Sequence, residues 1–327
     1  MSNEKRNLIL TSALAINEEQ LDAIRALGYY VSLLPDDQPA PKELAAEAEV
    51  VVCYKFFKFN TLSDFPKLRY VHSVATGVEL LPLKELAQGG LAVGKGRDLY
   101  SIPMAEWAVC RLLEHYKRSR RYAENARRHY WEKAAWVDYR SEIEELAGRK
   151  VAIYGTGDIA AVLCRMLRAF EVESIAGMNS TGHIVEGYDV CYAPHQLAEF
   201  LEDRDVVVTL APLTAENQEI FDEKAIAGMK DGAVFVSLSR GKLVKTKAVV
   251  EALRSGKLGA FLADVVAEEP IGPENELWDM ENVYLTPHNS FITEMRPVRL
   301  NQLIYDNLQH YLATGKPRDA VDLNKGY

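Results

Sequence analysis

An arginine, a glutamate and a histidine occur in the second half of the chain, each just after an apolar, strand-like run. They are Arg240 in Leu238-Ser239-Arg240-Gly241, Glu269 in Glu268-Glu269-Pro270 and His288 in Thr286-Pro287-His288. A guanidinium can hold a carboxylate through two parallel hydrogen bonds. A histidine titrates near neutrality, so it can give a proton to a carbonyl oxygen and take it back. A neighbouring glutamate would favour the charged imidazolium and fix its ring. These are the parts needed to reduce a 2-keto acid, and the three residues are the catalytic candidates.

Each of the three residues, taken alone, also fits an ordinary structural explanation. Arg240 would be a surface arginine in a turn, and Glu269 one of 47 acidic residues. His72, in a strand-like run, is the main rival to His288 among the seven histidines. Because the carboxyl ends of strands in a doubly wound sheet face the ligand crevice, the position of all three after successive strands favours a shared site.

A glycine-rich turn lies upstream of these residues. The strand-like Val151-Ala152-Ile153-Tyr154 leads into Gly155-Thr156-Gly157-Asp158-Ile159-Ala160, and a helical pattern follows. This strand–turn–helix context is what a GxGxxG/A dinucleotide-binding motif requires. The N–H groups of Asp158 and Ile159 would point at the phosphates from a helix N-terminus. The alternative is a strand-to-helix turn that binds no ligand.

The next strand should end in an acid that holds the adenosine ribose. Here Ser174–Met178 is followed by Asn179, Ser180 and Thr181, which could donate hydrogen bonds to a 2′-phosphate. No Arg or Lys lies between residues 174 and 184 to secure that phosphate. The cofactor is therefore NAD or NADP, with a slight preference for NADP. Asp264, an acid at the end of an apolar strand, is a candidate acceptor for the nicotinamide amide.

Strand and helix signals alternate along most of the chain, which predicts an α/β protein with a doubly wound parallel sheet. The first hundred residues predict a small α/β domain. A long helix is predicted from Ser101 into the basic stretch Lys117–Arg121, and a last helix ends at Gly315. Further strands are predicted at six places: 151–154, 174–177, 206–210, 233–238, 260–264 and 283–285.

Composition limits the class of protein. A chain of 327 residues suggests about two domains. The formal net charge of −9 makes affinity for nucleic acid or anionic membrane unexpected, so the basic stretch is interpreted as a solvated or subunit-facing helix surface. The four cysteines form no CxxC pair, so a metal site is not expected. Free thiols are typical of a reducing compartment, which predicts a cytoplasmic location. Neither a signal peptide nor a run of about 18 apolar residues is found.

These motifs together resemble the D-isomer-specific 2-hydroxyacid dehydrogenase family, which includes phosphoglycerate, D-lactate and glyoxylate/hydroxypyruvate dehydrogenases. The matching segments are the glycine turn, Leu210-Ala211-Pro212-Leu213-Thr214, Ser239-Arg240-Gly241, Ala263-Asp264-Val265, Glu269-Pro270 and Thr286-Pro287-His288. The resemblance implies a Rossmann-type NAD(P)-binding domain at 100–289. It also implies a smaller, discontinuous, flavodoxin-like substrate domain at 1–99 and 290–327.

The same resemblance implies roles for individual residues. His288 would be the acid/base, Glu269 its partner and Arg240 the substrate anchor. Members are usually homodimers, with the helix from Ser101 in the interface, and act on small 2-keto or 2-hydroxy acids. Further cofactor contacts are implied at Leu210, Ala211, Pro212, Leu238 and Ser239. Substrate contacts are implied at Tyr54, Lys55, Phe56, Ala75, Thr76, Gly77 and Tyr100.

The chain departs from the family pattern in places. Asn289-Ser290-Phe291 replaces a pair of small residues after the histidine, and Lys245 stands where an acid is common. A second hypothesis is therefore a catalytically silent dinucleotide-sensing or corepressor-like protein on the same fold. A methyltransferase using the glycine turn would leave Arg240, Glu269 and His288 unexplained.

Overall fold

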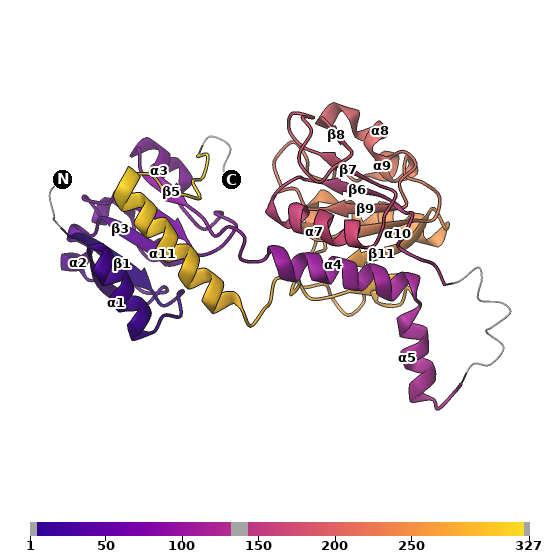
Figure 1. Cartoon of the computed structure of the whole chain (residues 1–327), viewed down its shortest axis with the longest axis horizontal. Coiled ribbons are helices and arrows are strands. Elements are labelled where there is room, and N and C mark those ends of the chain that lie inside the picture. The colour runs from indigo at the N-terminus through magenta and orange to yellow at the C-terminus, as the bar shows by residue number, and fades with distance from the viewer. Residues whose placement is uncertain (1–4, 132–142, 324–327) are drawn as a thin grey trace. The chain divides into compact units, whose positions relative to one another are not determined.

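The computed structural model describes residues 5–131 and 143–323. The chain forms two compact units, one made of Met1–Leu99 and Thr293–Tyr327, the other of Tyr100–Ile292. Each unit contains its own sheet (Figure 1). Among the described residues, no helix combines the length and apolar character needed to cross a membrane.

The first unit is built on a five-stranded parallel sheet in the order β2-β1-β3-β4-β5. This is the order of flavodoxin-like folds. The central strands are fully buried, as their continuous apolar runs require. The strands are β1 (Arg6–Thr11), β2 (Tyr29–Leu34), β3 (Val50–Cys53), β4 (Tyr70–Ser73) and β5 (Ala92–Gly94). The helices are α1 (Glu18–Leu27), α2 (Lys42–Glu47), α3 (Leu83–Gln88) and α11 (Arg296–Thr314), with short 3₁₀ turns η1 (Phe56–Lys58) and η2 (Leu62–Asp64).

Helix α11 packs on this sheet although it lies more than two hundred residues away in sequence (Figure 1). Tyr311 stacks on Tyr70 of β4 with ring centroids 4.5 Å apart, and the Tyr29 hydroxyl donates to the Leu308 carbonyl at 3.0 Å. Gly315 ends the helix in the left-handed conformation that favours glycine, as predicted. The last helix therefore completes the core of the N-terminal unit.

The second unit contains a seven-stranded parallel sheet in the order β12-β11-β10-β9-β6-β7-β8. The order reverses at β6, as in a doubly wound Rossmann-type sheet, so the predicted fold class is confirmed. Its strands are β6 (Lys150–Tyr154), β7 (Ser174–Met178), β8 (Val190–Tyr192), β9 (Val206–Thr209), β10 (Ala233–Ser237), β11 (Leu258–Ala263) and β12 (Val283–Leu285). The helices are α4 (Ser101–Tyr116), α5 (Ser119–Arg127), α7 (Asp158–Ala169), α8 (Leu197–Leu201), α9 (Glu223–Ala227) and α10 (Thr246–Arg254), with 3₁₀ turns η4 (Pro194–Gln196), η5 (Gly241–Leu243) and η6 (Glu276–Trp278).

The helix predicted to run from Ser101 into the basic stretch is wrong at its end. Helix α4 stops at Tyr116, Arg118 adopts a left-handed φ of 52°, and α5 starts at Ser119. Helix α5 leaves the body of the unit and buries none of its residues (Figure 1). Arg120 attaches it to β12, donating to the Val283 carbonyl at 2.8 Å and lying 3.6 Å from the centre of the Tyr284 ring. The basic stretch thus spans a helix break instead of extending a helix.

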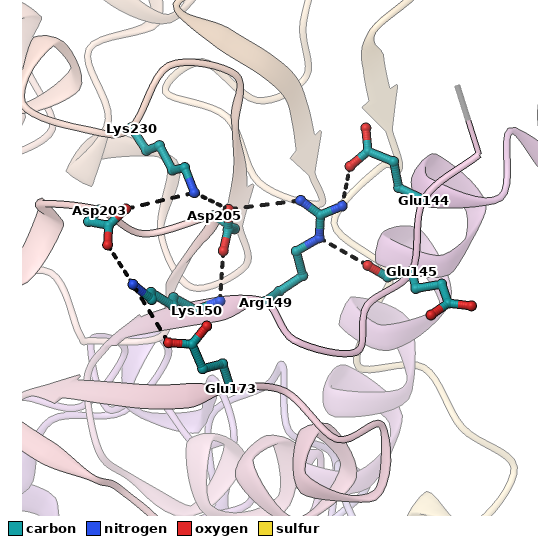
Figure 2. Close-up of polar contacts among 8 residues, drawn as sticks. All are labelled: Glu144, Glu145, Arg149, Lys150, Glu173, Asp203, Asp205 and Lys230. Carbon is teal, nitrogen blue, oxygen red and sulfur yellow. Dashed lines mark hydrogen bonds and ion pairs between the residues drawn. The ribbon is translucent and has the colours of Figure 1, made fainter. Parts of the chain in front are cut away.

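Ion pairs link the amino ends of several strands (Figure 2). Asp205, just before β9, accepts from the Lys150 N–H at 2.8 Å and pairs with the Lys230 ammonium at 2.7 Å. The Lys150 ammonium lies 2.6 Å from Asp203, and this hydrogen bond holds the pKa of Asp203 below its usual range. Arg149 adds contacts with the Glu144 carboxylate and with Asp205. These ion pairs connect the segments that lead into β6, β9 and β10.

Candidate active site

Gly155 brings together two segments expected to bind the cofactor. It follows β6 with a φ of +108°, a conformation that side chains disfavour. A methyl group on it would lie 2.5 Å from the Ala211 nitrogen and 2.8 Å from the Leu210 carbonyl carbon. Glycine is therefore required here, because the Leu210–Ala211 backbone passes directly over the turn.

The start of α7 is suited to an anionic ligand. Gly157 is its N-cap and supplies no side chain to the first N–H groups of this 12-residue helix, among them that of Ile159. A Cβ atom on Gly157 would meet nothing within 4 Å. Ala160 is 1 % exposed and packs in the core, as its position requires. The open space beside a helix N-terminus fits a dinucleotide pyrophosphate.

The loop after β7 is organised by Asn179. Its side-chain oxygen accepts from the Thr181 N–H, the Thr181 hydroxyl and the Gly182 N–H at 2.8–3.0 Å, while its amide donates to the His183 carbonyl. Asn179 therefore shapes the loop, and its polar atoms are already used within it. Ser180 and Thr181 are exposed at its surface.

The strand ends of β9 and β10 meet at Thr209. Its hydroxyl accepts from the Leu238 N–H at 3.3 Å. Beside it, the Ser239 hydroxyl is buried and has no hydrogen-bond partner among the described residues. An orphaned hydroxyl at this edge fits a polar ligand that completes it. Pro212 follows Ala211 in the same loop, and its carbonyl accepts from the Asn217 amide at 2.8 Å.

Arg240 and Gly241 follow β10. The Arg240 guanidinium donates to the Ser239 carbonyl at 2.9 Å, which orients the side chain along its own turn. A Cβ atom on Gly241 would lie directly on the Val266 carbonyl. The turn carrying Arg240 is thus packed against the segment that follows β11. The atypical Lys245 nearby pairs with Glu223 at 2.8 Å.

His288 and Glu269 form a hydrogen-bonded couple after β12 and β11. Nδ1 of His288 lies 2.7 Å from Oε2 of Glu269. The other carboxylate oxygen of Glu269 accepts from the Val266 N–H at 3.1 Å. With Nδ1 engaged by a carboxylate, Nε2 is the nitrogen left to face a substrate. The side chain of His288 is 42 % exposed, so a ligand can reach it.

Phe291 lies against this couple. Its ring is 6.0 Å from the His288 ring and 5.3 Å from the Tyr100 ring, edge-to-face in both cases. Tyr100, expected at the substrate, is thereby joined to His288 through one aromatic side chain. Phe291 places an apolar wall beside the histidine, where the family pattern would have a small residue.

Asp264 is 3 % exposed at the end of β11. Its carboxylate accepts hydrogen bonds from the Thr286 hydroxyl and from the N–H groups of Asn289 and Ser290. The acid expected to face the nicotinamide amide is thus engaged by the loop that carries His288.

In the N-terminal unit, the Tyr54–Lys55 segment is held by Asp36, which sequence reasoning missed. Asp36 is 4 % exposed, and its two oxygens accept from the Tyr54 N–H at 2.9 Å and the Lys55 N–H at 2.7 Å. The Lys55 ammonium lies 3.5 Å from Asp37. Phe56 is fully buried against Phe65, so the expectation that it faces a substrate is wrong.

The loop Ala75-Thr76-Gly77 follows β4 in the same unit. The Ser73 hydroxyl accepts from the Ala75 N–H at 3.2 Å and donates to the Gly77 carbonyl at 3.3 Å, so it closes the loop. Thr76 is exposed at its tip. The rival histidine, His72, lies just before this loop but is fully buried, with Nδ1 2.6 Å from the Tyr70 hydroxyl.

Across residues 5–131 and 143–323, no cluster of three or more His, Cys, Asp or Glu side chains is placed to hold a metal ion.

Comparison with known proteins identifies the family. Residues 109–290 match the family model described as "D-isomer specific 2-hydroxyacid dehydrogenase, NAD binding domain". The chain belongs to this family. This agrees with the sequence-based resemblance and supports activity as an NAD(P)-dependent 2-hydroxyacid dehydrogenase.

Among its relatives, a glyoxylate reductase from Korarchaeum cryptofilum is 30% identical over 244 residues, which cover 74% of this chain and 73% of the relative. A D-isomer specific 2-hydroxyacid dehydrogenase from Xanthobacter autotrophicus Py2, solved with NADPH and MES, is 25% identical with a TM-score of 0.78 and covers 99% of this chain and 100% of its own. The NADPH-dependent glyoxylate/hydroxypyruvate reductase SmGhrA from Sinorhizobium meliloti, solved with NADP and sulfate, is 26% identical with a TM-score of 0.73. The match covers 99% of this chain and 100% of SmGhrA.

Proposed function

We propose that this protein reduces the C2 carbonyl of a small 2-keto acid to a D-2-hydroxy acid, and catalyses the reverse reaction. The observation that carries the proposal is the 2.7 Å contact between His288 Nδ1 and Glu269, made at the ends of neighbouring strands β12 and β11. Family membership supplies the reaction class. The relatives named glyoxylate and hydroxypyruvate reductases favour a small substrate.

His288 is the proton donor in this proposal. Glu269 accepts the Nδ1 hydrogen, which stabilises the imidazolium and directs Nε2–H toward the carbonyl oxygen. When bound, the nicotinamide supplies the hydride that goes to C2. The proton from His288 completes the hydroxyl group, and in the reverse direction His288 takes that proton back.

Arg240 anchors and polarises the substrate, because a guanidinium presents two parallel donors to a carboxylate or keto-carboxylate oxygen pair. In the N-terminal unit, the loop Ala75-Thr76-Gly77, with Thr76 exposed at its tip, is proposed to offer backbone N–H groups to the substrate carboxylate. Tyr54, Lys55 and Tyr100 are proposed to surround the substrate side chain. The charge of Lys55 is already opposed by Asp37, so a dianionic substrate is not required to balance it.

The cofactor would be held by the Gly155–Ile159 turn, by Leu210, Ala211 and Pro212, and by Leu238 and Ser239. We propose a modest preference for NADPH over NADH. Residues 179–184, directly after β7, include no acid to repel a 2′-phosphate, and the exposed Ser180 hydroxyl is available to it. Asn179 contributes by shaping the loop, since its own polar atoms are engaged.

Two tests decide the proposal. The purified protein is assayed with NADPH and NADH against glyoxylate, hydroxypyruvate, pyruvate and branched 2-keto acids. His288→Ala is then expected to lower kcat on the best substrate by about 10²–10⁴-fold, the usual contribution of general acid–base catalysis. Near-native turnover by this variant would refute the mechanism. Tight dinucleotide binding without turnover of any keto acid would favour the dinucleotide-sensing alternative.

The protein is also proposed to form a homodimer through α4 and α5. A groove of about 1070 Å³ lies between these helices and α7, and its walls include Val109, Leu113, Met166 and Phe170. Beyond the end of α5, Tyr130 and Trp131 are 57% and 82% exposed. Exposed apolar area of this kind is typical of a subunit interface.

A further inference from the structure

The loop that carries His288 closes around one buried carboxylate. Thr286 Oγ1 donates to Oδ1 of Asp264 at 2.6 Å, and the Asn289 N–H donates to the same oxygen at 2.9 Å. The Ser290 N–H donates to Oδ2 at 3.0 Å. Three donors on both sides of His288 therefore converge on a side chain that is 3 % exposed.

The backbone of Asp264 fixes the same loop. Its carbonyl accepts from the His288 N–H at 2.9 Å, and its own N–H donates to the Ser237 carbonyl of β10 at 3.0 Å. His288 adopts a left-handed φ of 51°, a conformation that costs free energy for a residue other than glycine. Such a conformation persists only where its surroundings enforce it. Four hydrogen bonds that hold the loop end on Asp264, and the His288 N–H also lies 3.0 Å from the Thr286 carbonyl.

Val266, the second residue after Asp264, positions the partner acid. The Val266 N–H donates to Oε1 of Glu269, whose Oε2 contacts His288 Nδ1 at 2.7 Å. One short segment, Asp264–Val266, thus holds the histidine loop through its first residue and the glutamate through its last. The separation between the two catalytic side chains depends on this segment.

We propose that Asp264 is a positioning residue that sets the geometry of the His288–Glu269 couple by fixing the loop Thr286–Ser290. The inference rests on the proposed function of that couple. It differs from the expectation that Asp264 serves the cofactor amide, because it assigns the carboxylate to three protein donors of the loop. A carboxylate is specifically required, because both of its oxygens accept hydrogen bonds. In asparagine one of these oxygens is replaced by an NH₂ group. That group would face either the Ser290 N–H or the Thr286 hydroxyl and Asn289 N–H, so a donor would meet a donor.

The sharpest test removes one hydrogen bond without touching Asp264, His288 or Glu269. Thr286→Val replaces the hydroxyl by a methyl group of similar size, while Thr286→Ser keeps the hydroxyl and is the matched control. We expect Thr286→Val to lower kcat about tenfold, since small displacements of a catalytic group are costly. Thr286→Ser should keep kcat within about threefold of the wild-type value, because the hydrogen bond to Asp264 is retained. The dissociation constant of NADPH should change less than about twofold in both variants, because neither alters a cofactor contact.

Asp264→Asn provides the stronger perturbation. We expect kcat to fall at least about thirtyfold and the pH profile of kcat/KM to move its limbs, because the couple that governs protonation is displaced. A normal kcat with a raised KM for NADPH would overturn the inference and return Asp264 to the cofactor amide. Wild-type kcat in Thr286→Val, or no rescue by Thr286→Ser, would also overturn it.

A second measurement does not depend on turnover. The His288 imidazole signals are followed by NMR across pH in the cofactor-free wild type, Thr286→Val and Thr286→Ser. A displaced couple should shift the titration midpoint in Thr286→Val and leave it unchanged in Thr286→Ser. An unshifted Thr286→Val midpoint contradicts the positioning role. If the wild type turns over no keto acid, the proposed function fails, but this titration still decides whether Asp264 positions His288.

Discussion

Gly157 and Gly241 both lie just after strands of the second sheet, yet a methyl group would meet different surroundings at each. At Gly157 it would enter open space with an ordinary φ of −83°. At Gly241 it would collide with the Val266 carbonyl, and the N–H of Val266 holds Glu269. A substitution at Gly157 therefore tests cofactor binding, whereas a substitution at Gly241 tests the geometry of the His288–Glu269 couple.

Gly157→Ala is expected to fold with a free energy of unfolding within about 0.5 kcal/mol of the wild type. It should raise the Kd of NADPH at least about tenfold, because the methyl group occupies the space proposed for the pyrophosphate. Gly241→Ala should lower stability by about 1–3 kcal/mol and kcat together, as overpacking displaces Val266. Urea denaturation measures the free energy of unfolding of both variants, and fluorescence titration measures their Kd for NADPH. The opposite pattern, a stable Gly241→Ala with normal kcat, would contradict the proposed link through Val266.

Residue types could be predicted from the sequence further than residue contacts. Arg240, Glu269 and His288 could be named because their residue types and their positions after apolar strands can be read from the sequence. The hydrogen bonds by which Asp36, Asp264 and Asn179 hold nearby loops could not be predicted. Their partners are mainly backbone N–H groups, and the directions of those groups exist only once the fold is formed.

At the scale of elements, the sequence predicted most strands of the second sheet but missed one edge strand and one helix break. Strand β8 was not predicted because Val190–Tyr192 is a three-residue edge strand that is only partly buried, too short to show a periodic pattern. The break between α4 and α5 was also not predicted, since the left-handed residue there is Arg118, which carries no glycine or proline signal. Both features depend on packing at the border of the sheet.

The groove between α4, α5 and α7 gives the dimer proposal its test. Ala123 of α5 is exposed and lines this groove, so Ala123→Arg places a long charged side chain in the proposed interface. Ala126→Arg, on the same helix but outside the groove lining, is the matched control. We expect sedimentation to find monomers for Ala123→Arg and dimers for the wild type and the control, because a buried unpaired charge costs several kcal/mol. A dimeric Ala123→Arg would move the interface elsewhere.

At the scale of the whole molecule, each unit buries one neutral histidine outside the proposed active site. Burial lowers the pKa of His72, in β4 of the N-terminal unit, to about 3. Burial, followed by the nearby Arg118 and Arg149, lowers the pKa of His115, in α4 of the second unit, to about 4. Both lie far below the usual value near 6.5 in an unfolded chain.

The sign of the pH effect follows from these pKa values. Between about pH 6.5 and pH 4 the unfolded chain binds protons that the folded chain does not, so the free energy of unfolding falls as the pH is lowered. Each histidine contributes a slope of up to about 1.4 kcal/mol per pH unit in this window. Carboxylates such as Asp203 and Glu223, whose hydrogen bonds with Lys150 and Lys245 lower their pKa, lose their contribution progressively below about pH 5. Between about pH 7 and pH 5 the slope therefore comes mainly from the histidines.

Urea denaturation at about pH 7, 6 and 5 measures the slope. His72→Asn places an amide near the Tyr70 hydroxyl and removes the titrating ring. It should flatten the pH dependence of the transition that involves the N-terminal unit, whatever its effect on absolute stability. His129→Asn is the control, because His129 is exposed and its left-handed φ of 53° suits asparagine. Equal slopes for the wild type and His72→Asn would show that His72 is protonated without cost, and the buried, neutral state of its ring would then be wrong.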